Sequence, residues 1–270
     1  MRILKELGLD VAEDKTEPPS QRLTYLGVVF DMVAGELKID LESFTMIEAR
    51  QTMDRVLAGG KSSALTKTGL RRLVGQLSWA AQTMHGGRPH MRRLWDGLKG
   101  KPQRRTFLPS RSLADLEYWK ERMDDPNWKG SKLIYREQEY PVMTMKSNAS
   151  GTEGAGYHFG GCEHMYKWKP WQLKRSIQWK ELHPIIVAAR RHRHEWNGRI
   201  VRFGVDNQSV VYMINSGKSK CDHCQCLLRE LSELERRYQF RSISSWVPRE
   251  FNVVSDLLSR QIAICDQPTH

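Results

Sequence analysis

The sequence predicts an α/β protein in which a mixed five-stranded sheet with flanking helices follows a smaller, mostly helical segment that contains a β-hairpin. Three observations predict this class. The first half opens on a hairpin pattern and continues with 3.6-residue periodicity. The second half has three short strand patterns joined by glycine turns, after which helix and strand patterns alternate. The turn-rich segment DDPNWKG lies between the halves, so we expect one domain over 1–130 and another over 131–270.

The elements of the first half are predicted from its turn and helix-breaking residues and from the spacing of its apolar residues. RLTYLGVVFDMVAGELKI predicts a hairpin that turns at 34–35. A helix is expected over 43–57, stopped by a Gly-Gly pair. After Thr66 the apolar residues fall at i, i+3, i+4 and i+7, which predicts a helix whose other side is basic. A third helix is expected over 113–123.

The elements of the second half are expected in the order strand, strand, strand, helix, strand, helix, helix, strand, helix. Their expected ranges are 139–147, 155–159, 165–168, 177–195, 199–205, 207–215, 224–238, 240–247 and a last helix from 252. Three consecutive strands followed by alternation predict a mixed sheet with helices packed on it.

Composition excludes several classes of protein. A hydrophobic content of 39% in 270 residues excludes wholesale disorder, and neither an apolar run of 18 residues nor a signal-peptide core is present. We therefore expect an intracellular protein, nuclear or cytoplasmic, without a membrane partner. The five cysteines fit reduced thiols better than a disulfide framework. In KCDHCQC, the cysteines and His223 are read either as zinc ligands or as small apolar residues at a helix start.

The positive charge is concentrated in one stretch. The net charge is +12, and residues 61–111 contain twelve Lys or Arg against one acid, Asp96. Such a concentration indicates a polyanion partner bound in a salt-dependent manner, or alternatively a solvated basic helix face. The candidate nucleic-acid-binding arginines of this stretch are Arg71, Arg72, Arg88, Arg92, Arg93, Arg104 and Arg105.

Three carboxylates and one amide are expected where such a fold brings side chains together. Asn148 ends the first strand of the second half, and Asp206 ends the apolar strand RIVRFGV. Glu181 lies at the border of a helix's apolar face, and Asp256 lies on the last helix. Singly, each has a structural explanation as a cap, a dipole partner or a solvated residue. Clustered, carboxylates repel one another unless a divalent cation such as Mg²⁺ neutralises them.

Four segments carry a resemblance to a known family. TMKSNASGTEGAG, SIQWKEL, VRFGVDNQSVVYMINSGKS and SWVPREFNVVSDLLSR resemble the RNase H domain of retroelement reverse transcriptases, especially those of tyrosine-recombinase (DIRS-like) retrotransposons. Upstream, TYLGVVFDMVAGELKI resembles the end of the polymerase palm with its primer-grip hairpin. The segment LTKTGLRRLVGQLSWAAQTMHGGRPHMRRLWDGL resembles the thumb and connection that follow.

The resemblance implies an RNase H-like fold, binding of an RNA:DNA hybrid, and metal-dependent endonucleolytic cleavage of its RNA strand with two Mg²⁺ or Mn²⁺ ions. It places the catalytic positions at Asn148, Glu181, Asp206 and Asp256, with the last three as metal ligands. It also adds Asn207 and Gln208 as nucleic-acid contacts. A polymerase subunit, or a further part of the element, is an expected partner.

The sequence departs from the family pattern in three places. Asn148 stands where the family has an aspartate that bridges both ions, so we expect activity lowered by orders of magnitude. Either a natural domain has lost hydrolysis, or a single introduced change keeps substrate uncut. SSWVPREFN offers Trp246, Arg249 and Glu250 where many relatives have a histidine, and the polymerase aromatic-x-Asp-Asp motif is missing.

Two other functions remain open from the sequence. The first is a domesticated, catalytically inactive module that binds nucleic acid or protein. The second is a basic DNA-binding protein unrelated to hydrolysis, which leaves the acidic residues unexplained.

Overall fold

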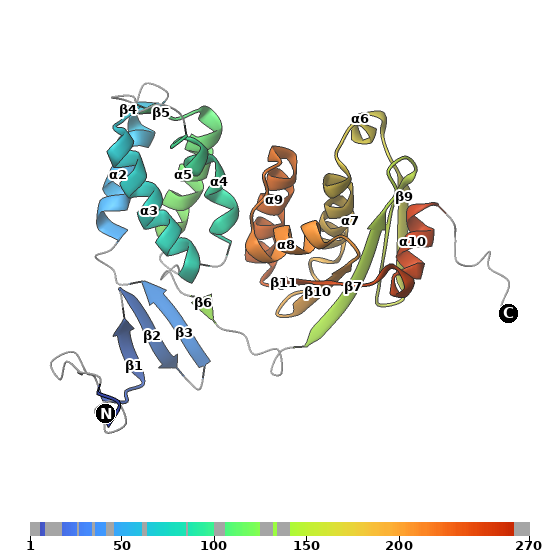
Figure 1. Cartoon of the computed structure of the whole chain (residues 1–270), viewed down its shortest axis with the longest axis horizontal. Coiled ribbons are helices and arrows are strands. Elements are labelled where there is room, and N and C mark those ends of the chain that lie inside the picture. The colour runs from blue at the N-terminus through green and yellow to red at the C-terminus, as the bar shows by residue number, and fades with distance from the viewer. Residues whose placement is uncertain are drawn as a thin grey trace.

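The structure of the protein is a computed structural model (Figure 1). The structure describes residues 6–8, 18–25, 27–33, 36–41, 46–60, 64–84, 86–99, 106–124, 132–133 and 141–261. Within these ranges, no helix combines the length and the apolar character that crossing a bilayer requires.

The N-terminal part begins with a small antiparallel sheet. Its strands are β1 (Arg22–Tyr25), β2 (Val28–Val33), β3 (Glu36–Leu41) and β6 (Lys132–Leu133), in that spatial order. The predicted hairpin is confirmed for β2 and β3, while β1 adds a strand on the other side of β2. The turn predicted at 34–35 lies outside the described residues. Because β6 pairs with β3 just after the expected boundary at 130, the division into 1–130 and 131–270 stays a prediction.

Helices form the rest of this part. They are α2 (Ile47–Gly59), α3 (Lys67–Thr83), α4 (Arg92–Asp96) and α5 (Ser110–Asp124), with the 3-10 helix Arg88–His90 before α4 and the short pair β4 (Ala64–Leu65) and β5 (Thr106–Phe107). The Thr66 side chain caps α3 by accepting from the backbone N–H of Gly69. The apolar face predicted for α3 is buried against α2 and α5, around Met53 and Trp119.

The C-terminal part is built on a five-stranded mixed sheet. Its strands are β7 (Val142–Ala149), β8 (Gly154–Phe159), β9 (Cys162–Lys167), β10 (Ile200–Val205) and β11 (Arg241–Trp246). Their spatial order is β11-β10-β7-β8-β9; β10 runs parallel to β7 and β11, while β8 runs antiparallel to β7 and β9. Together with the flanking helices, this order confirms the predicted RNase H-like fold.

Helices cover both faces of this sheet. Helices α7 (Ile177–His192), α8 (Gln208–Ser216) and α9 (Asp222–Tyr238) lie on one face, whereas α10 (Val253–Ser259) packs on the other against β7 and β8 (Figure 1). The short α6 (Pro170–Leu173) precedes α7, and a 3-10 helix, Arg249–Phe251, precedes α10. Cys224 is buried near the start of α9, beside the partly exposed Cys221. This position suits the apolar reading of the cysteine cluster.

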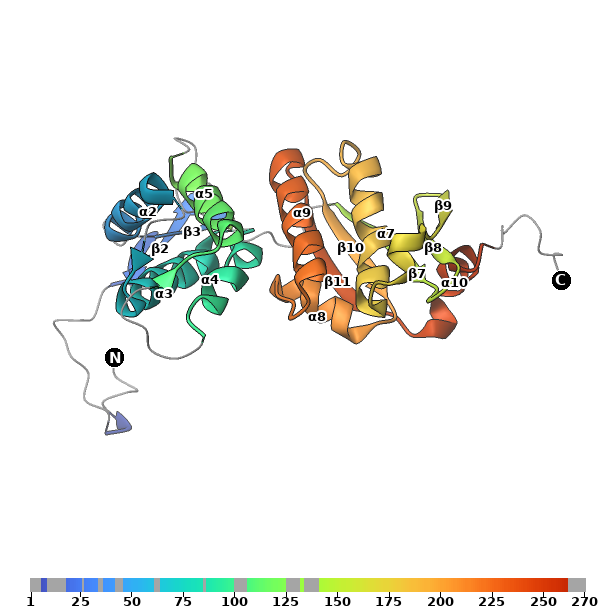
Figure 2. The same ribbon diagram turned by 90° about the horizontal axis from the view of Figure 1, so that it is seen from above.

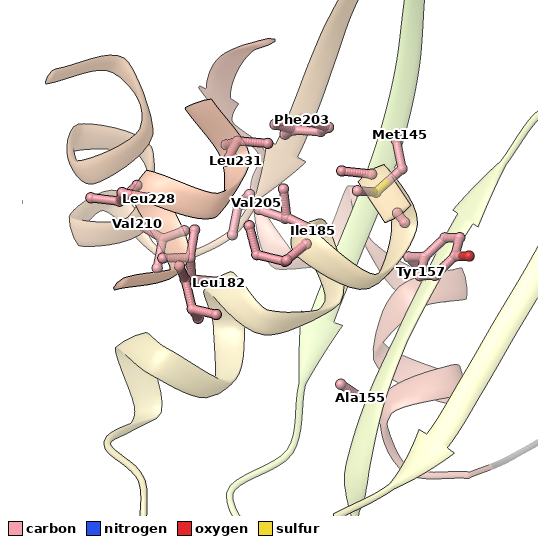
Figure 3. Close-up of a cluster of buried hydrophobic side chains, with 14 of the residues drawn as sticks. Met145, Ala155, Tyr157, Leu182, Ile185, Phe203, Val205, Val210, Leu228 and Leu231 are labelled. Atoms are coloured by element: carbon pink, nitrogen blue, oxygen red, sulfur yellow. The ribbon is translucent and has the colours of Figure 1, made fainter. Parts of the chain in front are cut away.

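Each part has its own hydrophobic core. In the C-terminal part, the core lies between the sheet and helices α7 to α9 (Figure 3). It includes Met145, Tyr157, Leu182, Ile185, Phe203, Val205, Val210, Leu228 and Leu231. The central strand β10 is buried along almost its whole length, because sheet neighbours flank it and helices cover its face. This continuous burial explains its apolar sequence, IVRFGV.

The two parts meet where α9 lies beside the 3-10 helix Arg88–His90 and α5 (Figure 2). The buried carboxylate of Asp115 accepts two hydrogen bonds from Arg229, at 3.0 and 3.1 Å. Gln225 donates to the carbonyl of Pro89 at 2.9 Å, and Ser232 donates to the carbonyl of Gly86 at 3.0 Å. A buried, bidentate ion pair and two hydrogen bonds to backbone therefore join the basic N-terminal part to the RNase H-like part.

Candidate functional site

Four elements bring the predicted catalytic positions together at one edge of the C-terminal sheet. Asn148 lies at the end of β7, Glu181 on α7, Asp206 directly after β10 and Asp256 on α10. All four line one pocket of about 310 Å³. The parallel strands β7 and β10 end side by side, so the residues at their carboxyl ends meet at this edge.

Helix α10 lies close enough to the sheet to carry Asp256 into the pocket. A Cβ atom at Gly156 of β8 would lie 2.3 Å from the Cβ of Leu258, so this approach requires glycine there. The Asn252 side chain donates to the carbonyl of Ser147 at 3.0 Å. Lys146 donates to the carbonyl of Phe251 at 2.9 Å. These contacts hold the start of α10 against β7.

Asn148 uses both ends of its amide inside the protein. It is buried; its Oδ1 accepts from the backbone N–H of Ala149 at 2.8 Å, and its Nδ2 donates to Asp256 Oδ1 at 2.9 Å. An aspartate at this position has no N–H to donate, so this contact with Asp256 depends on the amide. Asn148 is therefore a hydrogen-bond partner of the carboxylate beside it.

Two arginines complete the surroundings of Asp256. Arg249 Nη2 lies 3.2 Å from Oδ1, and Arg260 Nη2 lies 3.1 Å from Oδ2. Both arginines donate charge-assisted hydrogen bonds to Oδ1 of Asp256, and Arg260 also forms an ion-pair contact with Oδ2.

Glu181, in contrast to Asp256, is buried and has few hydrogen-bond partners. Its side chain is 5% exposed, and its Oε2 has no hydrogen-bond partner among the described residues. Burial, with the nearby charge of Asp206, raises the pKa of Glu181 from 4.5 to about 8. Burial also raises the pKa of Asp206, against the attraction of Arg249.

This pKa shift predicts a pH dependence of stability. A carboxyl group whose pKa is higher in the folded state stabilises the fold below its unfolded pKa, and this contribution is lost as pH rises through the folded pKa. We expect the free energy of unfolding to fall between about pH 4.5 and pH 8, because Glu181 must become charged in a buried place. Glu181→Gln should flatten this slope in urea denaturation series. An equally steep slope in that variant would contradict the assignment.

The pocket does not fit the two-ion site that the family resemblance implies. No three His, Cys, Asp or Glu side chains of the described residues are arranged to hold a metal ion. Asn148 Oδ1 already accepts from backbone, and both oxygens of Asp256 are bound to arginine. Glu181 lines the pocket, and its buried Oε2 has no hydrogen-bond partner among the described residues. The two predicted ions stay a prediction.

The predicted arginines of the basic stretch occupy different environments. Arg71 and Arg88 are exposed, with no ion pair to any described residue. Arg72 pairs with Glu48 at 3.0 Å, Arg92 pairs with Asp96 at 3.0 Å, and Arg93 donates to the carbonyl of Arg111 at 3.0 Å. Arg104 and Arg105 lie outside the described residues. The exposed indole of Trp95 lies on the same short helix, α4, as Arg92 and Arg93.

The two polar residues after Asp206 have separate roles. The Asn207 side chain caps α8 by accepting from the backbone N–H of Ser209 at 3.0 Å. Gln208 is exposed and lines a groove together with Tyr212, Lys218 and Lys220. Of the two, Gln208 has the more exposed side chain, and its role as a nucleic-acid contact stays a prediction.

Sequence reasoning named Arg249 without assigning it to the pocket, and it missed Arg260 and the groove. Arg260 follows Asp256 by four residues on the last helix, and this i, i+4 spacing of opposite charges was a usable signal. No such signal was present in the sequence for Arg249. Its side chain reaches Asp256 only because of the way the 3-10 helix Arg249–Phe251 is placed before α10.

Comparisons of sequence give no match: no protein-family model matches the chain, and no curated protein matches it. Among solved structures, the chain is similar to the N-terminal RNase H domain of Rv2228c from Mycobacterium tuberculosis, solved as a fusion with maltose-binding protein. The identity is 20%, the TM-score is 0.36, and the match covers 45% of this chain and 96% of that one. It is also similar to RNase H1 from the archaeon Halobacterium salinarum, with 17% identity, a TM-score of 0.32 and coverage of 44% and 94%.

A third similar structure spans both parts of the chain. It is the foamy viral protease-reverse transcriptase in complex with double-stranded DNA, with 16% identity and a TM-score of 0.36. The match covers 91% of this chain and 49% of the viral chain, so this chain spans about half the length of that protein.

Proposed function

We propose that this chain is a reverse-transcriptase-derived, RNase H-like protein that binds RNA:DNA hybrid and whose nuclease chemistry is silenced at residue 148. The observation that carries the proposal is the convergence of Asn148, Glu181, Asp206 and Asp256 in one pocket at the carboxyl edge of an RNase H-like sheet. Residues from four separate elements, far apart in the sequence, meet there.

The proposed substrate class rests on the surfaces around that pocket. Gln208, Tyr212, Lys218 and Lys220 form a groove of about 570 Å³ that combines cationic, polar and aromatic side chains. Such a combination suits a nucleic-acid backbone and its bases. Arg71 and Arg88 are two exposed cationic side chains of the N-terminal part. An RNA:DNA hybrid is the form of nucleic acid that the RNase H-like fold is expected to favour.

The proposed loss of hydrolysis rests on the chemistry of Asn148. An amide can coordinate a cation but cannot neutralise it, and this amide is already engaged at both ends. Cleavage of the RNA strand in Mg²⁺ or Mn²⁺ would then need an aspartate at 148. We propose an origin in a retrotransposon, DIRS-like in subtype, with a polymerase subunit or further part of the element as partner and with a nuclear or cytoplasmic site of action.

One observation also favours a second function, a domesticated inactive binding module. The contact of Asn148 Nδ2 with Asp256 at 2.9 Å makes Asn148 an integral part of the pocket. If related copies of this chain carry asparagine at this position, the module has kept its binding surface and has lost hydrolysis.

Hybrid binding is tested by fluorescence anisotropy at several salt concentrations, with duplex DNA and duplex RNA as competitors. We expect the hybrid to bind more tightly than either duplex. In Arg71→Gln/Arg88→Gln, binding should weaken and the slope of log K against log salt should fall by about two, since each phosphate contact contributes about one to this slope. The control is Arg191→Gln/Arg199→Gln, which removes the same charge from exposed positions of the other part. Equal affinity for all three duplexes would contradict the proposal and favour a general DNA-binding protein.

A further inference from the structure

The surroundings of Asp256 differ from those of Glu181, another carboxylate that lines the pocket. Asp256 is 22% exposed and accepts hydrogen bonds from Asn148, Arg249 and Arg260. Glu181 keeps one oxygen without a partner in the described residues. Of these two carboxylates, Asp256 is therefore the one with cationic partners.

We infer that Arg249, Arg260 and Asn148 are resident counter-groups of Asp256, so that this carboxylate is compensated without a divalent cation and each arginine competes with a cation for it. This inference rests on the proposed function, because it takes the pocket to be the silenced nuclease site. It deepens that function by assigning part of the silencing to two arginines as well as to residue 148.

The two arginines reach Asp256 from either side along the chain. Arg249 belongs to the 3-10 helix before α10, and Arg260 is the residue that ends α10. Their backbones are held in place: the carbonyl of Phe251 accepts from Lys146, and the N–H of Arg260 donates to the carbonyl of Leu257 at 3.0 Å. Both guanidiniums are thus presented to Asp256 by anchored backbone segments.

Competition follows from the chemistry of arginine. A guanidinium keeps its charge at every pH at which the protein is folded, so it cannot release Asp256 by losing a proton. A cation that binds Asp256 must displace at least one guanidinium into solvent or accept its repulsion at short range. Removal of either arginine should therefore raise the affinity of the pocket for a cation.

The test is calorimetric titration of Mn²⁺ into the full chain and its variants in the absence of nucleic acid. Arg249→Gln and Arg260→Gln should each tighten Mn²⁺ binding several-fold, and the double variant should tighten it by about tenfold or more. Arg199→Gln is the charge-matched control, since Arg199 is exposed and precedes β10, at the opposite end of this strand from Asp206. Adding Asp256→Asn to the double variant should abolish the gain, which locates the ion.

Two results would overturn the inference. One is a double variant that binds Mn²⁺ no better than Arg199→Gln, and the other is an affinity gain that survives Asp256→Asn. If Arg260→Gln does not fold, as judged by its thermal melt, Arg249→Gln alone decides, because the Arg249 side chain is 65% exposed. Failure of the proposed function is a separate result: loss of hybrid preference in the anisotropy measurements would contradict hybrid binding without altering the Mn²⁺ titration.

Discussion

Asn148→Asp is expected to raise cleavage of the RNA strand of an end-labelled hybrid by at least about 100-fold in Mg²⁺ or Mn²⁺. The substitution adds a carboxyl group to a pocket that Glu153, Glu181, Asp206 and Asp256 already line. It also replaces the donor that lies 2.9 Å from Asp256 Oδ1 with a second negative charge. Repulsion between these carboxylates should favour binding of a divalent cation.

The same substitution should change stability in a metal-dependent manner. In EDTA, Asn148→Asp should melt at a lower temperature than the unaltered chain, because the added carboxylate lies beside Asp256 without a metal ion to offset the repulsion. Mg²⁺ should restore much of the loss, since a ligand that binds the folded state stabilises it. The unaltered chain should respond weakly to Mg²⁺.

Two controls make the result specific. Asn148→Ala removes the amide without adding a carboxylate, and it should remain inactive. Asn148→Asp/Asp206→Asn should lose the restored cleavage. If Asn148→Asp binds hybrid but does not cut it, the nuclease interpretation of Glu181, Asp206 and Asp256 should be abandoned in favour of a binding module.

Asp115→Asn is expected to lower the free energy of unfolding by about 3 kcal/mol, because it leaves the guanidinium of Arg229 without its carboxylate in a mostly buried place. Arg229 is 12% exposed and Asp115 is 2% exposed, so water cannot replace the lost partner. His90, whose pKa burial lowers, also contacts Asp115, at 3.3 Å, and stacks on Tyr118 with ring centroids 3.5 Å apart. The substitution therefore disturbs a whole buried cluster.

Urea denaturation checks this expectation. The matched control is Asp124→Asn, which removes a carboxylate of the same helix whose partners, Arg50 and Lys120, are exposed; it should cost less than about 1 kcal/mol. Asp115→Leu/Arg229→Met should recover much of the stability, because buried ion pairs can be replaced by apolar residues. A loss no larger than that of Asp124→Asn would contradict the role assigned to the contact.

The contact between Asp115 and Arg229 is also expected to affect nucleic-acid binding. It joins the part that carries Arg71 and Arg88 to the part that carries the acidic pocket. Loss of the contact should weaken hybrid binding and lower its salt dependence, because the two surfaces would no longer bind one duplex as a unit. Fluorescence anisotropy of hybrid binding by Asp115→Asn, measured at urea concentrations too low to unfold the protein, checks this expectation.

Much of the fold could be predicted because it depends on local patterns. The apolar spacing of Leu70, Leu73, Val74 and Leu77 is a property of α3 alone, and burial in the N-terminal core agrees with it. The order of strands and helices in the second half follows from alternation and glycine turns. Some differences lie at element ends: the first helix was expected from 43, and α2 begins at Ile47 with no side-chain cap. Others are short elements that the sequence did not predict as such, namely β1, β4, β5, β6, α4 and α6.

The sequence by itself determined the fold class, the chain order of the elements and the positions of the pocket's four predicted residues. These features depend on periodicity and motif spacing, which are properties of residues close together in the sequence. Only the tertiary structure decided what those residues do to one another. Asn148 donates to Asp256, Arg249 and Arg260 bind the same carboxylate, and Arg229 joins Asp115 across 114 positions of sequence. Such contacts depend on how helices pack on a sheet and on each other, and neither residue of a distant pair carries a local signal of its partner.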